Sequence, residues 1–240
     1  MSPRPQDLMR RARASLEVRA KVAVMSALAT TGLGRRGLLA RYRYAFTPRQ
    51  LWALCEAAEN ARRLDGAFLE IGVDRGETTV FLTRHLRTLG PLPRYLCVDT
   101  FTGFTSADVA AERGRGKNDD FDRWFRINSK QLLERAVTLN GLTETVEVIQ
   151  ADVNTLDFST IPPLAFALVD VDLYRPMRAA LGGAWSRLLP GGILVADDCQ
   201  PITHTWDGAR QAFEEFCQEA GIDADVRCDK LGFAQKPPAG

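Results

Sequence analysis

Uninterrupted apolar runs alternate with stretches of helical period along most of this chain. A short apolar strand at residues 68–71 contains one charged residue, Glu70, whereas the runs at 164–169 and 193–196 contain none. Runs without polar alternation are typical of parallel strands covered by helices on both faces. The stretch between the last two runs begins as a helix at Pro176 and stops at a Pro-Gly-Gly sequence, residues 190–192. This order predicts a right-handed β-α-β unit whose two strands end at the same edge of one sheet.

The remaining segments extend the pattern to seven strands. Short apolar strands are predicted within residues 94–101 and 145–153, and residues 223–236 predict a final hairpin. Further helices are predicted from Pro48 to near residue 64, from near Glu77, and across residues 128–140 and 206–221. The sequence therefore predicts an α/β protein with a Rossmann-like seven-stranded sheet and helices on both faces.

Residues 102–118 break this regularity. They contain glycines and charges with little apolar period, which predicts a loop with at most one helical turn. Long loops at the carboxyl edge of a sheet often act as lids over a site. We therefore expect a lid between the second strand and the helix that follows it.

Two pairs of carboxylates follow directly where two of the apolar runs end. Asp170 and Asp172 follow the run at 164–169, and Asp197 and Asp198 follow the run at 193–196. Because neighbouring parallel strands lie about 4.8 Å apart, these four acids are expected to converge, and their repulsion favours a bound cation or proton. The alternative is that each acid caps a helix or starts a turn.

A glycine turn follows the first strand. Glu70, Gly72 and Gly76 form an E-x-G-x-x-x-G sequence between strand and helix, in which glycine lets the backbone approach a ligand closely. The dinucleotide fingerprint requires a glycine where Asp74 stands, which argues against a bound pyrophosphate. Acids also end the next two strands, where Asp99 is suited to ribose hydroxyls and Asp152 to an adenine edge. The alternative is a structural turn with two capping acids.

With these motifs the chain resembles the class I S-adenosylmethionine-dependent methyltransferases, and more narrowly the macrocin O-methyltransferase-like family of metal-dependent sugar methyltransferases. The resemblance covers roughly residues 66–236 and lies mainly in the VDVDLY and PGGILVADD blocks. It implies the class I methyltransferase sheet, with S-adenosylmethionine and Mg²⁺ as cofactors. Val171 stands where the family motif has glycine. The segments expected to bind the acceptor do not match the family closely enough to identify a substrate.

The resemblance also implies a role for each matching position. Asp99 would hold the ribose of the cofactor, Thr78 would contact its methionine carboxylate, and Asp152 would lie near the adenine. Glu70, Gly72 and Gly76 would form the cofactor turn. The implied metal ligands are Asp170, Asp197 and Asp198.

The chemistry implied is Mg²⁺-dependent transfer of a methyl group to a hydroxyl of a saccharide or a glycosylated natural product. An alcohol must lose its proton to attack the methyl group, so a base is needed beside the metal. The candidates are Asp172, Asp170 itself, and His204, which lies in the loop after the second acid pair. The acceptor, whether a small molecule or an oligosaccharide, is not indicated by the sequence.

Other classes of function make different demands. A catechol-like small-molecule O-methyltransferase would use the same acids. A nucleic-acid methyltransferase would explain the basic N-terminus, but no base-reading motif follows the fourth strand. A nicotinamide oxidoreductase would leave the four acids unexplained, and an inactive interaction module would not need them.

The composition is that of an ordinary globular protein, with 45% hydrophobic and 25% charged residues among 240. The five cysteines are scattered without ligand spacing, which predicts reduced thiols and a cytoplasmic location. The most apolar N-terminal stretch, residues 22–33, is too short and too polar to cross a membrane. We expect neither a signal peptide nor a transmembrane segment.

Charge is distributed unevenly along the chain. Residues 1–49 contain eleven Lys or Arg and two Asp or Glu, a net charge of +9, so residues 50–240 carry −8 within a total of +1. We expect residues 1–47 to form a basic helical arm and residues 48–240 to form the methyltransferase domain. Interleaved apolar residues predict an amphipathic face that packs on the acidic body, so no nucleic-acid partner is expected. The resemblance implies that the arm serves as a lid or subunit contact, as in a homo-oligomer.

Overall fold

The computed structural model describes residues 5–31, 42–117, 120–121, 125, 128–200 and 206–238, with side chains described from residue 16 onward except that of Ala29. The chain divides into two units, Met1–Ala45 and Phe46–Gly240, and each is described by itself. Among the described residues, no helix is long and apolar enough to cross a membrane.

The second unit is built around one seven-stranded sheet with the order β3-β2-β1-β4-β5-β7-β6. All neighbouring strands are parallel except β7, which runs antiparallel to both β5 and β6. The predicted seven-stranded sheet and final hairpin are therefore confirmed. The strands are β1 (Ala67–Ile71), β2 (Tyr95–Asp99), β3 (Val146–Gln150), β4 (Leu164–Val169), β5 (Leu188–Ala196), β6 (Asp225–Arg227) and β7 (Leu231–Gln235).

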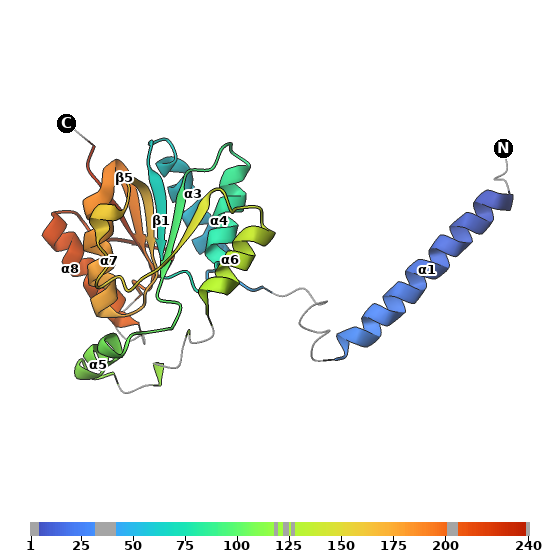
Figure 1. Cartoon of the computed structure of the whole chain (residues 1–240), viewed down its shortest axis with the longest axis horizontal. Helices are drawn as coiled ribbons and strands as arrows, with labels where there is room; N and C mark the ends of the chain where they lie inside the picture. The colour runs from blue at the N-terminus through green and yellow to red at the C-terminus, as the bar shows by residue number, and fades with distance from the viewer. Residues whose placement is uncertain are drawn as a thin grey trace. The chain divides into compact units, whose positions relative to one another are not determined.

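Helices cover both faces of this sheet (Figure 1). One face is covered by α3, α4 and α6, and the other by α7 and α8. Every residue of β4, the central strand, is fully buried between these layers, as its continuous apolar run predicts. The helices of this unit are α3 (Pro48–Ala61), α4 (Glu77–Arg87), α5 (Ser106–Gly114), α6 (Lys130–Leu139), α7 (Tyr174–Arg187) and α8 (Asp207–Ala220), with a 3-10 turn at Phe158–Thr160.

Helix α5 corrects the prediction of a loop with at most one helical turn. It spans nine residues, and the hydroxyl oxygen of Thr105 caps it by accepting a bond from the Asp108 amide at 3.1 Å. Asp108 and Glu112 are both only 3% exposed. The helix thus packs through hydrogen-bonded acids instead of an apolar stripe, which is why hydrophobic periodicity does not reveal it.

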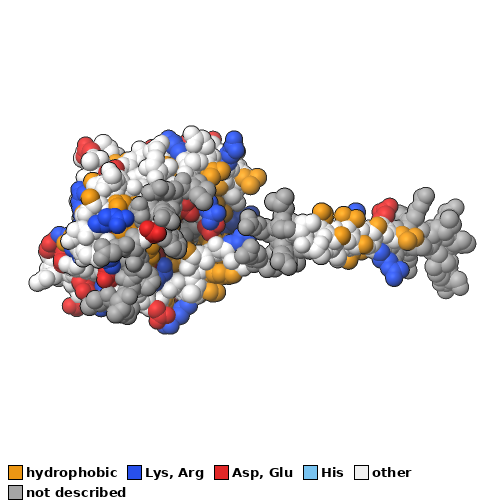
Figure 2. All heavy atoms as spheres, turned by 90° about the horizontal axis from the view of Figure 1, so that it is seen from below, with side chains coloured by type: hydrophobic (Ala, Val, Ile, Leu, Met, Phe, Trp, Pro, Cys, Tyr) orange, Lys and Arg blue, Asp and Glu red, His pale blue; other side chains and the backbone are white. Residues whose placement is uncertain are grey.

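The described part of the first unit contains helix α1 (Pro5–Ala29). The large apolar side chains that are described on it, from Leu16 onward, are at least 49% exposed, and Figure 2 shows hydrophobic side chains along the helix. At 100° per residue, Val18, Val22 and Met25 share one stripe, whereas Leu16 and Val24 lie on other sides. The helix therefore differs from the predicted one, because its apolar residues do not form a single face.

Candidate active site

The carboxylates that follow β4 and β5 converge at the carboxyl edge of the sheet. Val169 pairs with Ala196 in the parallel register, so both chains leave the sheet at the same level. Ligand oxygens of Asp170, Asp172 and Asp198 all lie within 4.8 Å of one another. Acids from two strands thus meet at one point, as the β-α-β unit predicts.

Local backbone geometry directs two of these acids. Asp172 and Asp198 have φ angles of 58° and 57°, in the left-handed region that non-glycine residues adopt infrequently. Such strain persists where the surrounding structure imposes it, and it is common at functional sites. Both side chains are nevertheless buried, with exposures of 8% and 5%.

Burial and mutual repulsion strongly perturb the acid cluster. Burial, followed by the charges of Asp197 and Asp198, raises the pKa of Asp170 well above its ordinary value. Burial also raises the pKa of Asp172 well above its usual range, with further contributions from Asp170 and Asp198. A cation bound among such carboxyl groups would replace the protons that their raised pKa values favour.

Asp197 has a different environment from the other three acids. Lys230 Nζ lies 2.5 Å from Asp197 Oδ2 and 3.6 Å from Asp198 Oδ1. Burial raises the pKa of Asp197 to about 6, and the ammonium group of Lys230 opposes that rise. The three acids whose oxygens gather most closely are Asp170, Asp172 and Asp198. The metal ligands implied by the resemblance were Asp170, Asp197 and Asp198, so the closest cluster contains Asp172 in place of Asp197.

The donor set fits a hard divalent cation. Each acid offers carboxylate oxygen, which Mg²⁺, Mn²⁺ and Ca²⁺ prefer over the nitrogen and sulfur ligands favoured by zinc. Asp197 Oδ1 is buried and has no hydrogen-bond partner, an arrangement that normally costs free energy unless something binds there. The residues present are thus chemically suited to hold such an ion.

The glycine turn is joined directly to the acid cluster. Gly72 has φ 83°, and a Cβ at this position would lie 1.8 Å from the carbonyl oxygen of Asp170. Gly76 has φ 78° and begins α4, where a Cβ would meet Leu133 at 2.3 Å. No other residue type fits these two positions without displacement of the backbone or its neighbours.

Asp99 ties this turn to the end of β2. Its Oδ2 accepts hydrogen bonds from the amides of Val73 and Asp74 at 2.9 and 3.1 Å. Its Oδ1 accepts from the Phe101 amide at 2.7 Å and from Asn128 Nδ2 at 3.2 Å. With the Thr100 hydroxyl at 3.5 Å from Oδ1, five donors surround this carboxylate, and a ribose hydroxyl must share it with them or displace one of them.

Glu70 lies in the core beneath the turn instead of at a ligand surface. It is 2% exposed, and its Oε2 accepts hydrogen bonds from the hydroxyls of Thr79 at 2.8 Å and Tyr95 at 2.7 Å. Burial raises the pKa of Glu70 to about 7. These bonds connect β1, β2 and α4. Glu70 is therefore placed to stabilise the glycine turn and not to contact a ligand.

Two further predicted residues, Thr78 and Asp152, follow the turn after β1 and the end of β3. Thr78 is half-buried in the first turn of α4, and Asp152 accepts two bonds from Asn154 after β3. His204 lies outside the described residues. His85, the other histidine of the chain, lies on α4 and pairs with Glu59 on α3 at 2.6 Å.

Several residues near the site carry no signal in the sequence motifs. Asn128, which is 7% exposed, contacts Asp99 while its own Oδ1 has no hydrogen-bond partner. Rings from three loops form an aromatic cluster, in which Phe104 lies 5.5 Å from Phe125 and 5.9 Å from Trp206. Helix α5 packs against α7, with Glu112 accepting a bond from the Tyr174 amide at 2.9 Å.

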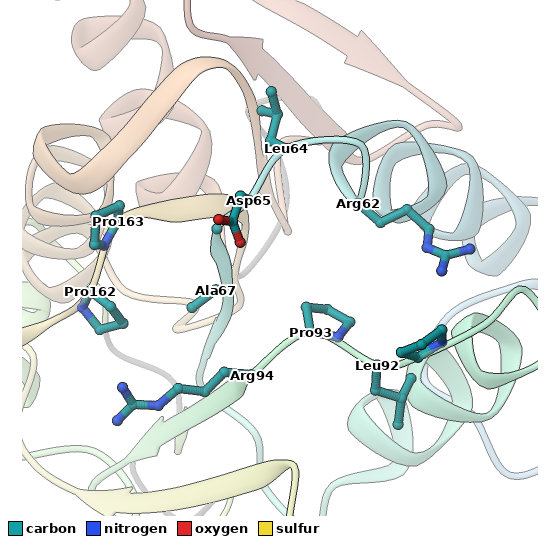
Figure 3. Close-up of a pocket in the computed structure, with 11 residues that line it drawn as sticks. Arg62, Leu64, Asp65, Ala67, Leu92, Pro93, Arg94, Pro162 and Pro163 are labelled. Carbon is teal, nitrogen blue, oxygen red and sulfur yellow. The ribbon is translucent and has the colours of Figure 1, made fainter.

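Two hollows elsewhere on the domain hold none of the predicted site residues. One of about 410 Å³ lies at the opposite edge of the sheet, between Arg62, Arg94 and two proline pairs (Figure 3). The other, of about 1230 Å³, runs between α3 and the β6–β7 hairpin.

Comparisons with known proteins agree with this geometry. A family model described as Macrocin-O-methyltransferase (TylF) matches residues 16–234. A solved structure of the O-methyltransferase NovP aligns with TM-score 0.63 at 18% identity, covering 82% of this chain and 84% of that one. Cofactor-bound Rv0187 from MTB aligns with TM-score 0.56 at 17% identity, covering 100% of both chains.

CalS11, described as a TDP-rhamnose 3′-O-methyltransferase in calicheamicin biosynthesis, aligns with TM-score 0.53 at 16% identity, covering 98% of this chain and 96% of that one. At these identities the structures establish a shared fold. A comparison with curated proteins gives no significant match.

Proposed function

The chain belongs to the macrocin O-methyltransferase family and is an S-adenosylmethionine-dependent O-methyltransferase, and on this premise we propose that it methylates a hydroxyl of a saccharide or glycosylated natural product with the help of Mg²⁺. The observation that carries the proposal is the convergence of Asp170, Asp172 and Asp198 within 4.8 Å. When bound there, Mg²⁺ would lower the pKa of a coordinated hydroxyl and orient two adjacent oxygens of the acceptor.

The cofactor would lie along the ends of β1, β2 and β3. Asp99 would accept the ribose hydroxyls, since it already lies among backbone amides of the glycine turn. Gly72 and Gly76 would let the backbone approach the cofactor, and the first turn of α4 with Thr78 would hold its carboxylate at a helix N-terminus. Asp152 would lie beside the adenine.

Asp172 is our choice for the base. Its proton affinity is raised by burial and by its neighbours, and it lies within the same cluster as the proposed metal ligands. It would take the proton of the acceptor hydroxyl at its carboxylate oxygen while the methyl group is transferred in line. Asp170 and Asp198 would then hold the ion, and Asp197 would support them.

A saccharide acceptor is supported by the family and by the aromatic cluster. The structural relative CalS11 is described as acting on TDP-rhamnose, and the family is named for macrocin. Phe104, which follows β2, packs against the rings of Phe125 and Trp206. Aromatic faces pack well against the apolar C–H faces of sugars as well as against planar rings.

The test is methyl transfer from labelled S-adenosylmethionine to a panel of nucleotide sugars, glycosylated natural products and catechols, with Mg²⁺ or a chelator. We expect transfer to a sugar hydroxyl that requires Mg²⁺. Asp170→Asn should abolish transfer while leaving cofactor binding by calorimetry intact, and Asp172→Asn should retain metal binding but slow transfer about a hundredfold or more. The exposed Asp223→Asn is the matched control.

Transfer to catechols alone would contradict the saccharide assignment. Full activity after exhaustive chelation, with metal content checked by elemental analysis, would contradict the role of Mg²⁺.

A further inference from the structure

Lys230 occupies an unusual position for a basic residue, inside a cluster of acids at the edge of the sheet. Its side chain is 20% exposed and reaches two of the acids, Asp197 at 2.5 Å and Asp198 at 3.6 Å. Within the part of the chain that the structure describes, no other basic side chain forms an ion pair with the four acids. One positive charge therefore faces four potential negative charges.

The hairpin between β6 and β7 holds Lys230 in place. Its turn contains two residues in the left-handed region, Cys228 with φ 51° and Asp229 with φ 73°. The side-chain amide of Gln50, on α3, donates to the Cys228 carbonyl at 2.9 Å, and the Cys199 amide donates to the Lys230 carbonyl at 2.7 Å. The backbone of Lys230 is thus anchored from two directions.

The ammonium group is also fixed at its tip. Lys230 Nζ lies 4.7 Å from the ring centroid of Phe46, a cation–π contact that strengthens when the pair is shielded from water. Phe46 itself is 1% exposed. A lysine held by its backbone, by an aromatic face and by a carboxylate has little freedom to leave the cluster.

This arrangement divides the adjacent acids into two roles. Lys230 engages Oδ2 of Asp197, and the other oxygen, Oδ1, is buried without a hydrogen-bond partner. The three remaining acids form the closest cluster. A fixed cation beside that cluster relieves the repulsion among the acids, and for the same reason it opposes the entry of a second cation.

We propose that Lys230 is a built-in counter-cation of the metal site: it positions Asp197 and lowers the affinity of the acid cluster for a divalent ion. This inference rests on the proposed Mg²⁺ site. The consequence is a cluster that stays folded without a metal and binds the ion weakly enough to exchange it. Lys230 is thus a positioning residue and does not itself contact the acceptor.

The test compares Lys230→Met, Lys230→Arg and a control, Lys236→Met. Lys236 lies at the other end of β7, with its Nζ 5.7 Å from the aromatic ring of Trp185, but it bonds to a backbone carbonyl and not to the acids. Mn²⁺ and Mg²⁺ affinities are measured by calorimetry, and thermal unfolding is followed with chelator and with Mg²⁺.

We expect Lys230→Met to bind both ions about tenfold or more tightly than the wild type, to melt at lower temperature in chelator, and to recover more on addition of Mg²⁺. Lys230→Arg and Lys236→Met should stay close to the wild type. If Lys230→Met binds the ions with unchanged or weaker affinity than the wild type, Lys230 does not have this role although the metal site stands. If no variant and no wild-type protein binds either ion, both this inference and the Mg²⁺ part of the proposed function are wrong.

Discussion

Replacing Glu70 by Gln should stabilise the protein at high pH. The pKa of Glu70 rises from 4.5 to about 7, mainly because the carboxyl group is buried. A folded-state pKa above the unfolded value means that stability from this group is complete below about pH 4.5 and is lost as the pH rises through about 7. Gln cannot ionise, and its carbonyl can still accept the bonds from Thr79 and Tyr95. The variant should therefore escape this loss.

The size of the effect follows from the two pKa values. At about 1.4 kcal/mol per pKa unit, the interval from 4.5 to about 7 corresponds to about 3 kcal/mol above pH 8. Part of the loss is already present at about pH 5, so the advantage of Glu70→Gln should grow by about 2 to 3 kcal/mol between about pH 5 and about pH 8.5.

The assay is equilibrium urea unfolding, followed by circular dichroism, of the wild type and the variant in the same buffers. Glu147→Gln is the control, because this acid is 49% exposed and pairs with Arg94 at the surface, where removal of a charge changes stability by about 1 kcal/mol or less. A stability difference between Glu70→Gln and the wild type that does not change with pH would refute the reasoning.

Three further predictions concern the site. Asp99→Asn should weaken S-adenosylmethionine binding about tenfold to a hundredfold by loss of a charged acceptor, and unchanged affinity in calorimetry would contradict its role. Because the pKa values of Asp170 and Asp172 are raised, Mg²⁺ binding should release protons and tighten as the pH rises. Calorimetry in buffers of different ionisation enthalpy measures this release, and none is expected if the ion binds elsewhere. Gly72→Ala should cost about 3 kcal/mol or more, since its Cβ would lie 1.8 Å from a backbone oxygen, whereas Gly114→Ala, with open space around it, should be nearly neutral in thermal unfolding.

The sequence predicts those features that depend on local pattern. The continuous apolar run of β4 has the predicted bounds, Leu164–Val169, because full burial on both faces requires such a run. The convergence of Asp170 and Asp198 follows from the handedness of the β-α-β unit. Each of these inferences uses only the sequence of two strands and of the segment that connects them.

Features that depend on distant contacts were not accessible in this way. Lys230 meets Asp197 across 33 residues, and no spacing rule connects a hairpin turn with the end of β5. Helix α5 buries Asp108 and Glu112 through hydrogen bonds, so its packing leaves no hydrophobic period. The Thr105 cap three residues before Asp108 is the signal that could have revealed this helix.

The direct backbone contact between Gly72 and Asp170 restricts how this chain could acquire a different acceptor. The ends of β1 and β4 touch without an intervening side chain, so neither can shift to suit a new substrate without displacing the other. The loops that carry Phe104 and Trp206 are joined by contacts between side chains instead, and such contacts tolerate exchange of one ring for another. Substitutions that adapt the protein to a new acceptor should therefore accumulate in those loops, while the backbone at the ends of β1 and β4 keeps its shape.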